Sequence, residues 1–352
     1  MSGLQVNVLR HPRVANVIMW VVSKCIGRPS FRSLGIVLFE ALFARQAIAA
    51  LRGVDVIHHI GQAHELIGFA AAAAARKLGV PFVIQPTVHP GQWGDSPFDF
   101  YLYQQAQGLF AITNFERNFL ESCGLSGPFF IVGNGIDNRT DGNANRFRQS
   151  YSLEGPIVLF LGRKTPDKGY TLLKQAFSLV QAQRPDAKLV CMGPTPGEQP
   201  SQVCLEVKDG VLELGFGSEQ DKHDALAACT MLCVPSEGEA FGLVYMEAGR
   251  YAKPVIGRRL PVLEELLGRQ GAGLLVGRAY GEGNQVGLDV IELKDAILQL
   301  LNDPQLAEQL GKNADQVSEA FIWSRVVTRF ETAYRNAVAN KTVSLECLSQ
   351  TN

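Results

Sequence analysis

The run Ser-Glu-Gly-Glu-Ala-Phe-Gly-Leu-Val-Tyr-Met-Glu-Ala, residues 236–248, decides how the second half of the chain is interpreted. It follows the short apolar run Met231–Val234, and its own apolar spacing predicts a helix at Phe241–Tyr251. An apolar run of strand length, then turn residues, then a helix is the repeating unit of a parallel α/β sheet. Two carboxylates, Glu239 and Glu247, flank the predicted start of this helix.

The same run predicts a ligand with two polar ends. Gly242 lets the backbone approach a bulky ligand, because glycine has no side chain to hold it off. The first N–H groups of a helix beginning near Phe241 would face a ligand beside Glu239. Glu247 lies roughly 9 Å further along the helix axis. A sugar nucleotide, whose sugar and nucleoside are joined by a diphosphate, has two such ends.

Short apolar runs alternate with amphipathic stretches through the whole chain, which is typical of parallel sheets with helical crossovers. The predicted strands are Leu4–Leu9, Val54–His58, Phe82–Gln85, Leu109–Thr113, Phe129–Val132, Ile157–Leu161, Ala187–Met192, Val211–Leu214, Met231–Val234, Pro254–Ile256 and Gly273–Val276. The predicted helices are Leu34–Leu51, Ala63–Leu78, Tyr170–Gln183, Asp221–Ala228, Phe241–Tyr251, Ile291–Leu301, Pro304–Glu319 and Phe321–Val338.

The composition changes once along the chain. Residues 133–150 are rich in Asn, Gly, Asp and Arg and nearly free of apolar side chains, which predicts a linker. We therefore predict an α/β protein of two Rossmann-like doubly wound domains facing each other across a cleft. The predicted boundaries are an N-terminal domain at 1–135, a linker at 136–152, a C-terminal domain at 153–320, and a helix at 321–340 that crosses back to the first domain.

Charge and cysteine usage narrow the class of protein. Lys and Arg number 33 against 34 Asp and Glu, which gives no reason to expect nucleic acid as a partner. Residues 1–60 hold seven Lys and Arg but only two acidic residues, Glu40 and Asp55. That excess fits anionic lipid head groups, a phosphorylated substrate or a solvated basic face. Seven cysteines without a C-x-x-C pair, and no signal-peptide pattern, predict a cytoplasmic protein, with the inner face of the membrane as a place of peripheral contact.

A second motif, Gly162-Arg163-Lys164-Thr165-Pro166-Asp167-Lys168-Gly169, lies between a predicted strand and a predicted helix. A glycine-bounded loop that carries Arg163 and Lys168 is suited to hold anionic oxygens near a helix N-terminus. The loop lacks the G-x-x-x-x-G-K-[ST] order of a P-loop. Alone it would equally be a solvated charged turn, and its position beside the Glu239 run favours the binding role.

With these motifs in place, the second half resembles the donor-binding domain of the retaining glycosyltransferases of family 4, the group 1 glycosyltransferases, which have the GT-B fold. The matching segments are Gly162–Gly169, Leu214–Phe216, Val234–Glu247, Lys253–Ile256 and Gly271–Val276. Together they cover residues 157–280 in the order of the family. The first half is similar more loosely, at residues 54–58, 79–81 and 134–137.

The resemblance implies a function and a set of site residues. It implies transfer of a sugar, with a hexosyl group expected, from a nucleotide diphosphate sugar to an acceptor hydroxyl, with retained configuration. The implied roles are Arg163, Lys168, Gly242 and Leu243 on the donor diphosphate, Glu247 on the ribose, Glu239 and Phe241 on the donor sugar, and Glu239 and His89 in catalysis. A glutamate suits vicinal hydroxyls, and cations offset the charge that grows on the departing diphosphate.

The acceptor side is predicted from a loop of the first half, residues 86–94, which holds His89. Trp93 in this loop and Asp95 directly after it are the candidates, Trp93 because aromatic faces pack against sugar rings, and His64 is a weaker one. The acceptor stays open among a glycan, a lipid-linked compound and a small molecule. No D-x-D pair occurs in the sequence, so no metal is predicted, because metal-dependent enzymes of this kind hold the metal by clustered carboxylates. No cofactor is predicted either, and the nucleotide sugar is the co-substrate.

One departure from the family pattern concerns the start of the chain. Members usually open with a strand, a glycine-rich loop and a helix, whereas Leu4–Leu9 resembles the second strand of the family. The expectation is a first domain that lacks its opening strand–loop–helix, either truncated or completed by a second polypeptide. The alternative function is therefore an inactive or partner-dependent subunit that binds the nucleotide sugar.

Overall fold

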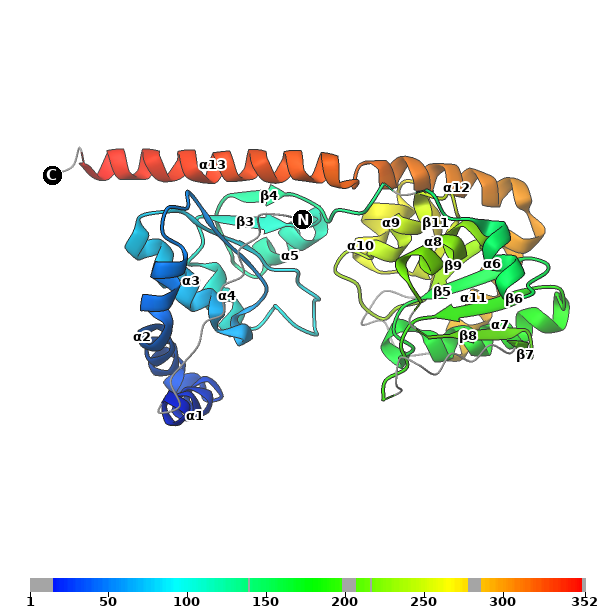
Figure 1. Ribbon diagram of the computed structural model, residues 1–352, viewed down its shortest axis with the longest axis horizontal. Helices are drawn as coiled ribbons and strands as arrows, with labels where there is room; N and C mark the ends of the chain where they lie inside the picture. The colour runs from blue at the N-terminus through cyan, green and yellow to red at the C-terminus, as the bar shows by residue number, and fades with distance from the viewer. Residues whose placement is uncertain (1–14, 139, 198–206, 216, 278–285, 350–352) are drawn as a thin grey trace. The chain divides into compact units, whose positions relative to one another are not determined.

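The computed structural model describes residues 15–138, 140–197, 207–215, 217–277 and 286–349. The chain forms two compact units: unit 1 comprises Met1–Val132 and Thr328–Asn352, and unit 2 comprises Gly133–Val327. Each unit has its own β-sheet with helices packed around it (Figure 1). Each is therefore a separate α/β body, as the alternation of apolar runs predicts.

Unit 1 has a four-stranded sheet of order β1-β2-β3-β4 in which all neighbours are parallel. The strands are β1 (Ile57–Ile60), β2 (Phe82–Gln85), β3 (Gly108–Ala111) and β4 (Phe129–Ile131). The helices are α1 (Ala15–Ile26), η1 (Pro29–Phe31), α2 (Arg32–Ala50), η2 (Ala63–Glu65), α3 (Ile67–Leu78), α4 (Pro97–Tyr103), α5 (Asn114–Ser122) and, from Thr328 onward, α13 (Trp323–Ser349).

The two faces of this sheet pack against different helices, because successive side chains of a strand point to opposite sides. Phe82 and Ile84 of β2 belong to the core cluster that includes buried side chains of α2 and α3. Val83, between them, packs instead with Ala333 and Ala337 of α13. Within unit 1, α13 therefore covers one face, while α3, α2 and then α1 follow on the other (Figure 1).

Unit 2 has a seven-stranded sheet of order β11-β10-β9-β5-β6-β8-β7, parallel except for β7. The strands are β5 (Ile157–Leu161), β6 (Lys188–Met192), β7 (Val207–Lys208), β8 (Val211–Leu214), β9 (Met231–Val234), β10 (Val255–Arg258) and β11 (Gly273–Val276). The helices are α6 (Ala144–Ser150), η3 (Pro166–Lys168), α7 (Tyr170–Gln183), α8 (Glu219–Ala228), α9 (Leu243–Gly249), α10 (Pro261–Leu263), η4 (Glu264–Gly268), α11 (Val286–Asn302) and α12 (Pro304–Glu319).

The strand order of unit 2 reverses direction at β5. From β5 the chain adds β6 and β8 on one side, and then returns to add β9, β10 and β11 on the other. In a doubly wound sheet the crevice at such a switch point, outside the carboxyl ends of the strands, is where ligands bind. The loops that follow β5 and β9 flank this point.

The structure departs from the sequence prediction in several places. Residues 144–150, inside the predicted linker, form α6, whose Phe147 is buried and which packs against α8. The helix predicted at 241–251 is the shorter α9, because Gly242 takes a left-handed conformation at its N-cap. The predicted strand Leu4–Leu9, and with it the question of a missing opening unit, lies outside the described residues, as does Phe216.

Candidate active site

Two loops of unit 2 are joined at the switch point. The loop after β5, residues 162–169, contains η3, and the loop after β9 runs from Pro235 to Gly242. The backbone N–H of Glu237 donates to the carbonyl oxygen of Asp167 at 2.8 Å, and the Ser236 hydroxyl lies 3.4 Å from the same oxygen. These contacts fix the two loops against each other.

Gly169 allows this close approach. It has φ of +72°, and a Cβ atom placed there would lie 2.3 Å from the carbonyl oxygen of Pro235. Any other residue would meet both a disfavoured backbone conformation and a collision with the second loop. Both the packing of the two loops and the backbone conformation of the turn therefore require glycine at the end of the predicted anion-binding motif.

Lys168 and Glu239, one from each loop, form an ion pair. Lys168 Nζ lies 2.8 Å from Glu239 Oε1, and the two side chains are 22% and 11% exposed. Such a charge-assisted hydrogen bond is stronger than one between neutral groups, and partial burial limits its screening by water. The structure thus brings together a predicted phosphate ligand and a predicted sugar ligand from distant parts of the sequence.

Arg163 has a different partner. Its guanidinium donates to Asp167 of the same loop at 3.2 Å, and more than half of each side chain is exposed. An exposed pair of this kind contributes between 0 and about 1 kcal/mol, so exchange of Asp167 for another anion costs little. Arg163 is therefore held less firmly in its ion pair than Lys168 is.

Glu247, on α9, is held by a residue that the sequence analysis missed. Lys222 Nζ of α8 lies 3.0 Å from Glu247 Oε1 and 2.7 Å from Glu219 Oε2. Burial lowers the pKa of Lys222, but its bonds to the two glutamates outweigh that effect and leave the pKa raised. Lys222 is therefore a charged partner of the predicted ribose ligand; its place on a polar helix surface carries no signal in the sequence.

Phe241 and Leu243 differ in exposure. The Phe241 side chain is 2% exposed and packs edge-on against Phe321, with 4.9 Å between ring centroids. Any contact of Phe241 with a ligand is therefore limited to its backbone. Leu243 is 43% exposed at the first position of α9.

A second missed group lies behind the loop after β5. Lys164 is almost buried, and its Nζ lies 2.9 Å from Glu213 Oε2 on β8. Glu213 also accepts hydrogen bonds from the Tyr170 hydroxyl at 2.5 Å and from Lys174 at 3.1 Å. This network ties the loop to α7 and β8. Nothing in the sequence separates Lys164 from its charged neighbours, because only the fold turns it inward.

In unit 1, His89 lies in the loop that follows β2. Its ring is 4.1 Å from that of Trp93 between centroids, and the two residues also form a β-bridge. Asp95 accepts a hydrogen bond from the Gly91 N–H at 2.6 Å. The structure therefore gathers the predicted residues His89, Trp93 and Asp95 in one compact loop.

A buried glutamate anchors that loop, and the sequence analysis did not single it out. Glu116, in the first turn of α5, accepts hydrogen bonds from Val88 N–H and from Ile112 N–H, each at 2.7 Å. Burial raises the pKa of Glu116 to about 7, although its backbone hydrogen bonds oppose the shift. Next to Val88, Thr87 has φ of +53°, which is a strained conformation for a β-branched residue. The pattern Thr113-x-x-Glu116 predicts a helix cap, but not this second contact.

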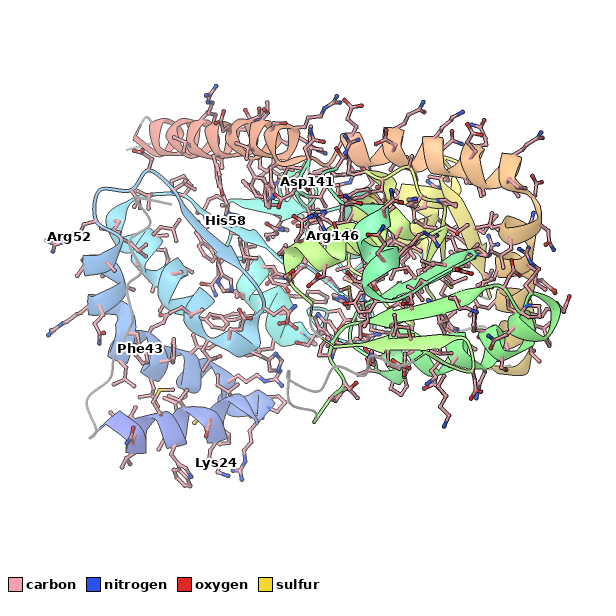
Figure 2. All side chains as sticks on the ribbon, turned by 45° about the vertical axis from the view of Figure 1, so that its right-hand side comes forward. Lys24, Phe43, Arg52, His58, Asp141 and Arg146 are labelled. Atoms are coloured by element: carbon pink, nitrogen blue, oxygen red, sulfur yellow. The ribbon has the colours of Figure 1, made fainter. Side chains whose placement is uncertain are left out.

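The remaining histidines of unit 1 have separate surroundings. His64 is mostly exposed, with its Nδ1 3.8 Å from Asp99 Oδ1. His58, labelled in Figure 2, lies 2.7 Å through its Nδ1 from the Tyr334 hydroxyl of α13. Burial, with a smaller effect from His59, lowers the pKa of His58 to about 4, so it is neutral at pH 7. His58 therefore has a packing role.

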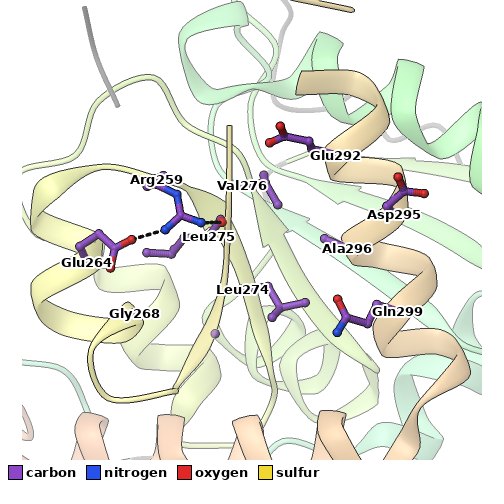
Figure 3. Close-up of a pocket in the computed structure, with 11 residues that line it drawn as sticks. Arg259, Glu264, Gly268, Leu274, Leu275, Val276, Glu292, Asp295, Ala296 and Gln299 are labelled. Carbon is purple, nitrogen blue, oxygen red and sulfur yellow. Dashed lines mark hydrogen bonds and ion pairs between the residues drawn. The ribbon is translucent and has the colours of Figure 1, made fainter. Parts of the chain in front are cut away.

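Two cavities of unit 2 lie away from the Lys168–Glu239 pair. One of about 460 Å³ lies between the edge strand β11, η4 and α11 (Figure 3). Its Arg259 is engaged by Glu264 and by the carbonyl oxygen of Leu275, at 2.5 and 2.7 Å. The other, of about 690 Å³, lies between α7 and β8. Among the residues that the structure describes, no three His, Cys, Asp or Glu side chains cluster as a metal site would require.

Comparison with known proteins decides the family. A sequence model for glycosyl transferases of group 1 matches residues 142–317, half of the chain. The chain belongs to this family, and it is a glycosyltransferase.

Relatives in sequence agree with this family, and solved structures agree with the fold. An uncharacterised glycosyltransferase of Methanocaldococcus jannaschii is 25% identical over 309 residues, which cover 84% of this chain and 80% of that protein. A D-inositol 3-phosphate glycosyltransferase of Corynebacterium glutamicum is 29% identical over 240 residues; the match spans 66% of this chain and about half, 54%, of the relative. The structure of HepE from Anabaena, in complex with UDP and glucose, aligns with a TM-score of 0.67 at 20% identity, covering 83% of this chain and 80% of HepE. The predicted GT-B fold with two Rossmann-like domains is thereby confirmed.

Proposed function

We propose that this glycosyltransferase takes its sugar from a nucleotide diphosphate sugar and transfers it to an acceptor hydroxyl, with retention and without a metal. The observation that carries the proposal is the Lys168–Glu239 pair at the switch point of unit 2. A cation and a carboxylate that contact each other there can separate to bind the phosphate and the sugar hydroxyls of one ligand. The complex of HepE with UDP and glucose, a protein of the same fold, supports this class of donor.

The donor-side roles follow from the charges. Lys168 and Arg163 hold the diphosphate, together with the backbone N–H groups of Gly242 and Leu243. Glu247 accepts hydrogen bonds from the ribose hydroxyls. Glu239, with the backbone of Phe241, holds the donor sugar, here expected to be a hexose.

The reaction breaks the bond between the anomeric carbon and the diphosphate oxygen, and the electron pair leaves with the diphosphate. Lys168 and Arg163 stabilise the negative charge as it develops. The acceptor oxygen attacks from the same face, and its proton passes to the leaving phosphate. We assign acceptor recognition to unit 1, with His89 beside the reacting groups, Trp93 and Asp95 in the same loop, and His64 as an additional contact.

A turnover assay with matched controls tests the donor assignment. Glu247→Gln should reduce the hydrolysis or transfer of a sugar nucleotide, whereas Glu219→Gln should not, although both residues accept from Lys222. Lys168→Ala should likewise abolish turnover, whereas Lys312→Ala, at an exposed lysine of α12 that pairs with Glu308, should retain it. Equal turnover in all four variants would refute the assignment. Nucleotide binding without turnover in the wild type would favour an inactive or partner-dependent subunit.

A further inference from the structure

The α1–η1–α2 segment of unit 1 carries an unusual concentration of exposed apolar side chains. Fifteen large hydrophobic residues of the described chain are exposed, and six of them lie between residues 17 and 37. These six are Val17, Ile18, Trp20, Phe31, Leu34 and Val37, with exposed fractions from 37% to 69%. Exposed apolar residues that occur singly need no explanation, but a concentration of them marks an interaction surface.

Their spacing places them on the outer side of two helices. Val17 and Trp20 are three residues apart on α1, and Leu34 and Val37 are three apart on α2, which puts each pair on one helix face. The opposite face of α2 is in the core of the unit, through Ile36, Phe39, Phe43 and Ala47. We refer to Val17, Ile18, Trp20, Phe31, Leu34 and Val37 as the apolar face of the α1–α2 segment.

The charges beside this face have one sign. Between residues 15 and 39 the charged side chains are Lys24, Arg28 and Arg32, and the first acidic residue is Glu40, which pairs with Arg76. Lys24, labelled in Figure 2, lies with its Nζ 5.8 Å from the centre of the Trp20 ring. Tryptophan beside lysine, with aliphatic side chains around them, is the composition of segments that lie at a membrane–water interface.

The residues Pro29–Ala50 are also apolar and long enough to cross a membrane, by length and composition. The structure favours a different arrangement, because one face of α2 is buried against α3 in the core of unit 1. A helix that contributes to a folded core on one side can lie on a bilayer with the other. The arrangement of α2 therefore fits contact with the surface of a membrane and not a transmembrane helix.

We propose that the apolar face of the α1–α2 segment, with Lys24 and Arg28, docks unit 1 onto an anionic lipid bilayer. The apolar side chains enter the boundary between head groups and acyl chains, and the two cations pair with lipid phosphates. This proposal does not depend on the identity of the sugar donor.

Co-sedimentation of the full chain with lipid vesicles tests the proposal. The chain should bind vesicles of phosphatidylcholine mixed with phosphatidylglycerol more tightly than vesicles of phosphatidylcholine alone. Each cation near an anionic surface contributes about 1 kcal/mol, so Lys24→Gln combined with Arg28→Gln should weaken binding to the anionic vesicles about 30-fold. Arg269→Gln, an exposed arginine of unit 2, should have no effect.

A second pair of variants tests the apolar contribution. Leu34→Ser should weaken binding to both kinds of vesicle, whereas Leu179→Ser, an exposed leucine of α7, should not. Because both leucines are exposed, the two substitutions should leave the midpoint of thermal unfolding close to that of the wild type. A shift of Trp fluorescence to shorter wavelength on adding anionic vesicles, reduced in Trp20→Phe, would support the docking. Failure of the wild type to sediment with anionic vesicles would overturn the proposal, as would a dimer in solution that Leu34→Ser dissociates.

Discussion

The replacement Glu116→Gln should change how the stability of the protein depends on pH. Glu116 is buried in unit 1, and its carboxylate holds Val88 N–H and Ile112 N–H. Burial raises its pKa from 4.5 to about 7. Because the pKa is higher in the folded chain, the contribution of Glu116 to stability is fully present below pH 4.5 and is lost as the pH rises to about 7.

The size of the effect follows from the shift. The rise in the pKa of Glu116 from 4.5 to about 7 corresponds to about 3 kcal/mol of unfolding free energy over the whole of that pH range. Glutamine cannot ionise, so the variant lacks this loss. His58 acts in the opposite direction: its lowered pKa means that stability is lost as the pH falls from 6.5 towards about 4. The comparison of variant with wild type removes the His58 contribution, which both share.

Urea unfolding at about pH 5 and about pH 8 measures the difference. Any cost of glutamine that does not depend on pH cancels in the comparison. The variant should gain about 2.5 kcal/mol relative to the wild type between about pH 5 and about pH 8, because a small part of the effect is already lost at the lower pH. Glu121→Gln, a partly exposed glutamate of the same helix, is the control and should follow the wild type. Parallel pH profiles for Glu116→Gln and the wild type would show that Glu116 does not titrate in this range.

Three further substitutions test the packing of the two units. Gly169→Ala should destabilise unit 2 by more than the roughly 1–2 kcal/mol expected for its backbone conformation alone, because the new Cβ meets Pro235. Gly53→Ala, with a similar φ and nothing within 4 Å, measures the conformational cost by itself. Equal losses of stability in thermal unfolding would contradict a collision at Gly169. Lys164→Met should lower the unfolding free energy more in the wild type than in a Glu213→Leu background, because only in the wild type does it leave a half-buried carboxylate short of one cation. Additive free energies in this double-mutant cycle would exclude the coupling. Tyr334→Phe should lower the unfolding free energy by about 1 kcal/mol through loss of the hydrogen bond to His58, and an unchanged urea midpoint would argue against that bond.

The sequence predicts the sheets of both units well because most of their strands are short, mainly apolar runs. Val211–Leu214 and Met231–Val234 are found with the predicted ends, and the helix Tyr170–Gln183 likewise. The helix predicted at 241–251 begins two residues late, because the left-handed Gly242 caps it. The linker prediction missed α6, whose seven residues contain a single buried aromatic residue, Phe147. Seven residues are too few to show the apolar periodicity of a helix.

The residues of the candidate site likewise fall into those that the sequence predicted and those that it did not. Lys168, Glu239 and Glu247 stand in recognisable motifs, so their residue types and order reveal them. The residues that support the site do not stand out in this way. Lys222 and Glu116 lie in other elements and Lys164 lies in the loop motif itself, and each acquires its role only when the fold brings it to a distant group. A single charged residue on a helix or in a turn looks the same in sequence whether it is solvated or buried.

The proposed function depends on Lys168 as a ligand of the donor diphosphate. Titration calorimetry of the full chain with UDP, GDP and ADP tests this role most directly. We predict that at least one of them binds, and that Lys168→Ala weakens this binding at least about tenfold, as expected for a lost hydrogen bond to a charged group, while Lys312→Ala leaves it unchanged. Binding of the same nucleotide with equal affinity to Lys168→Ala and to the wild type would exclude Lys168 from the diphosphate site.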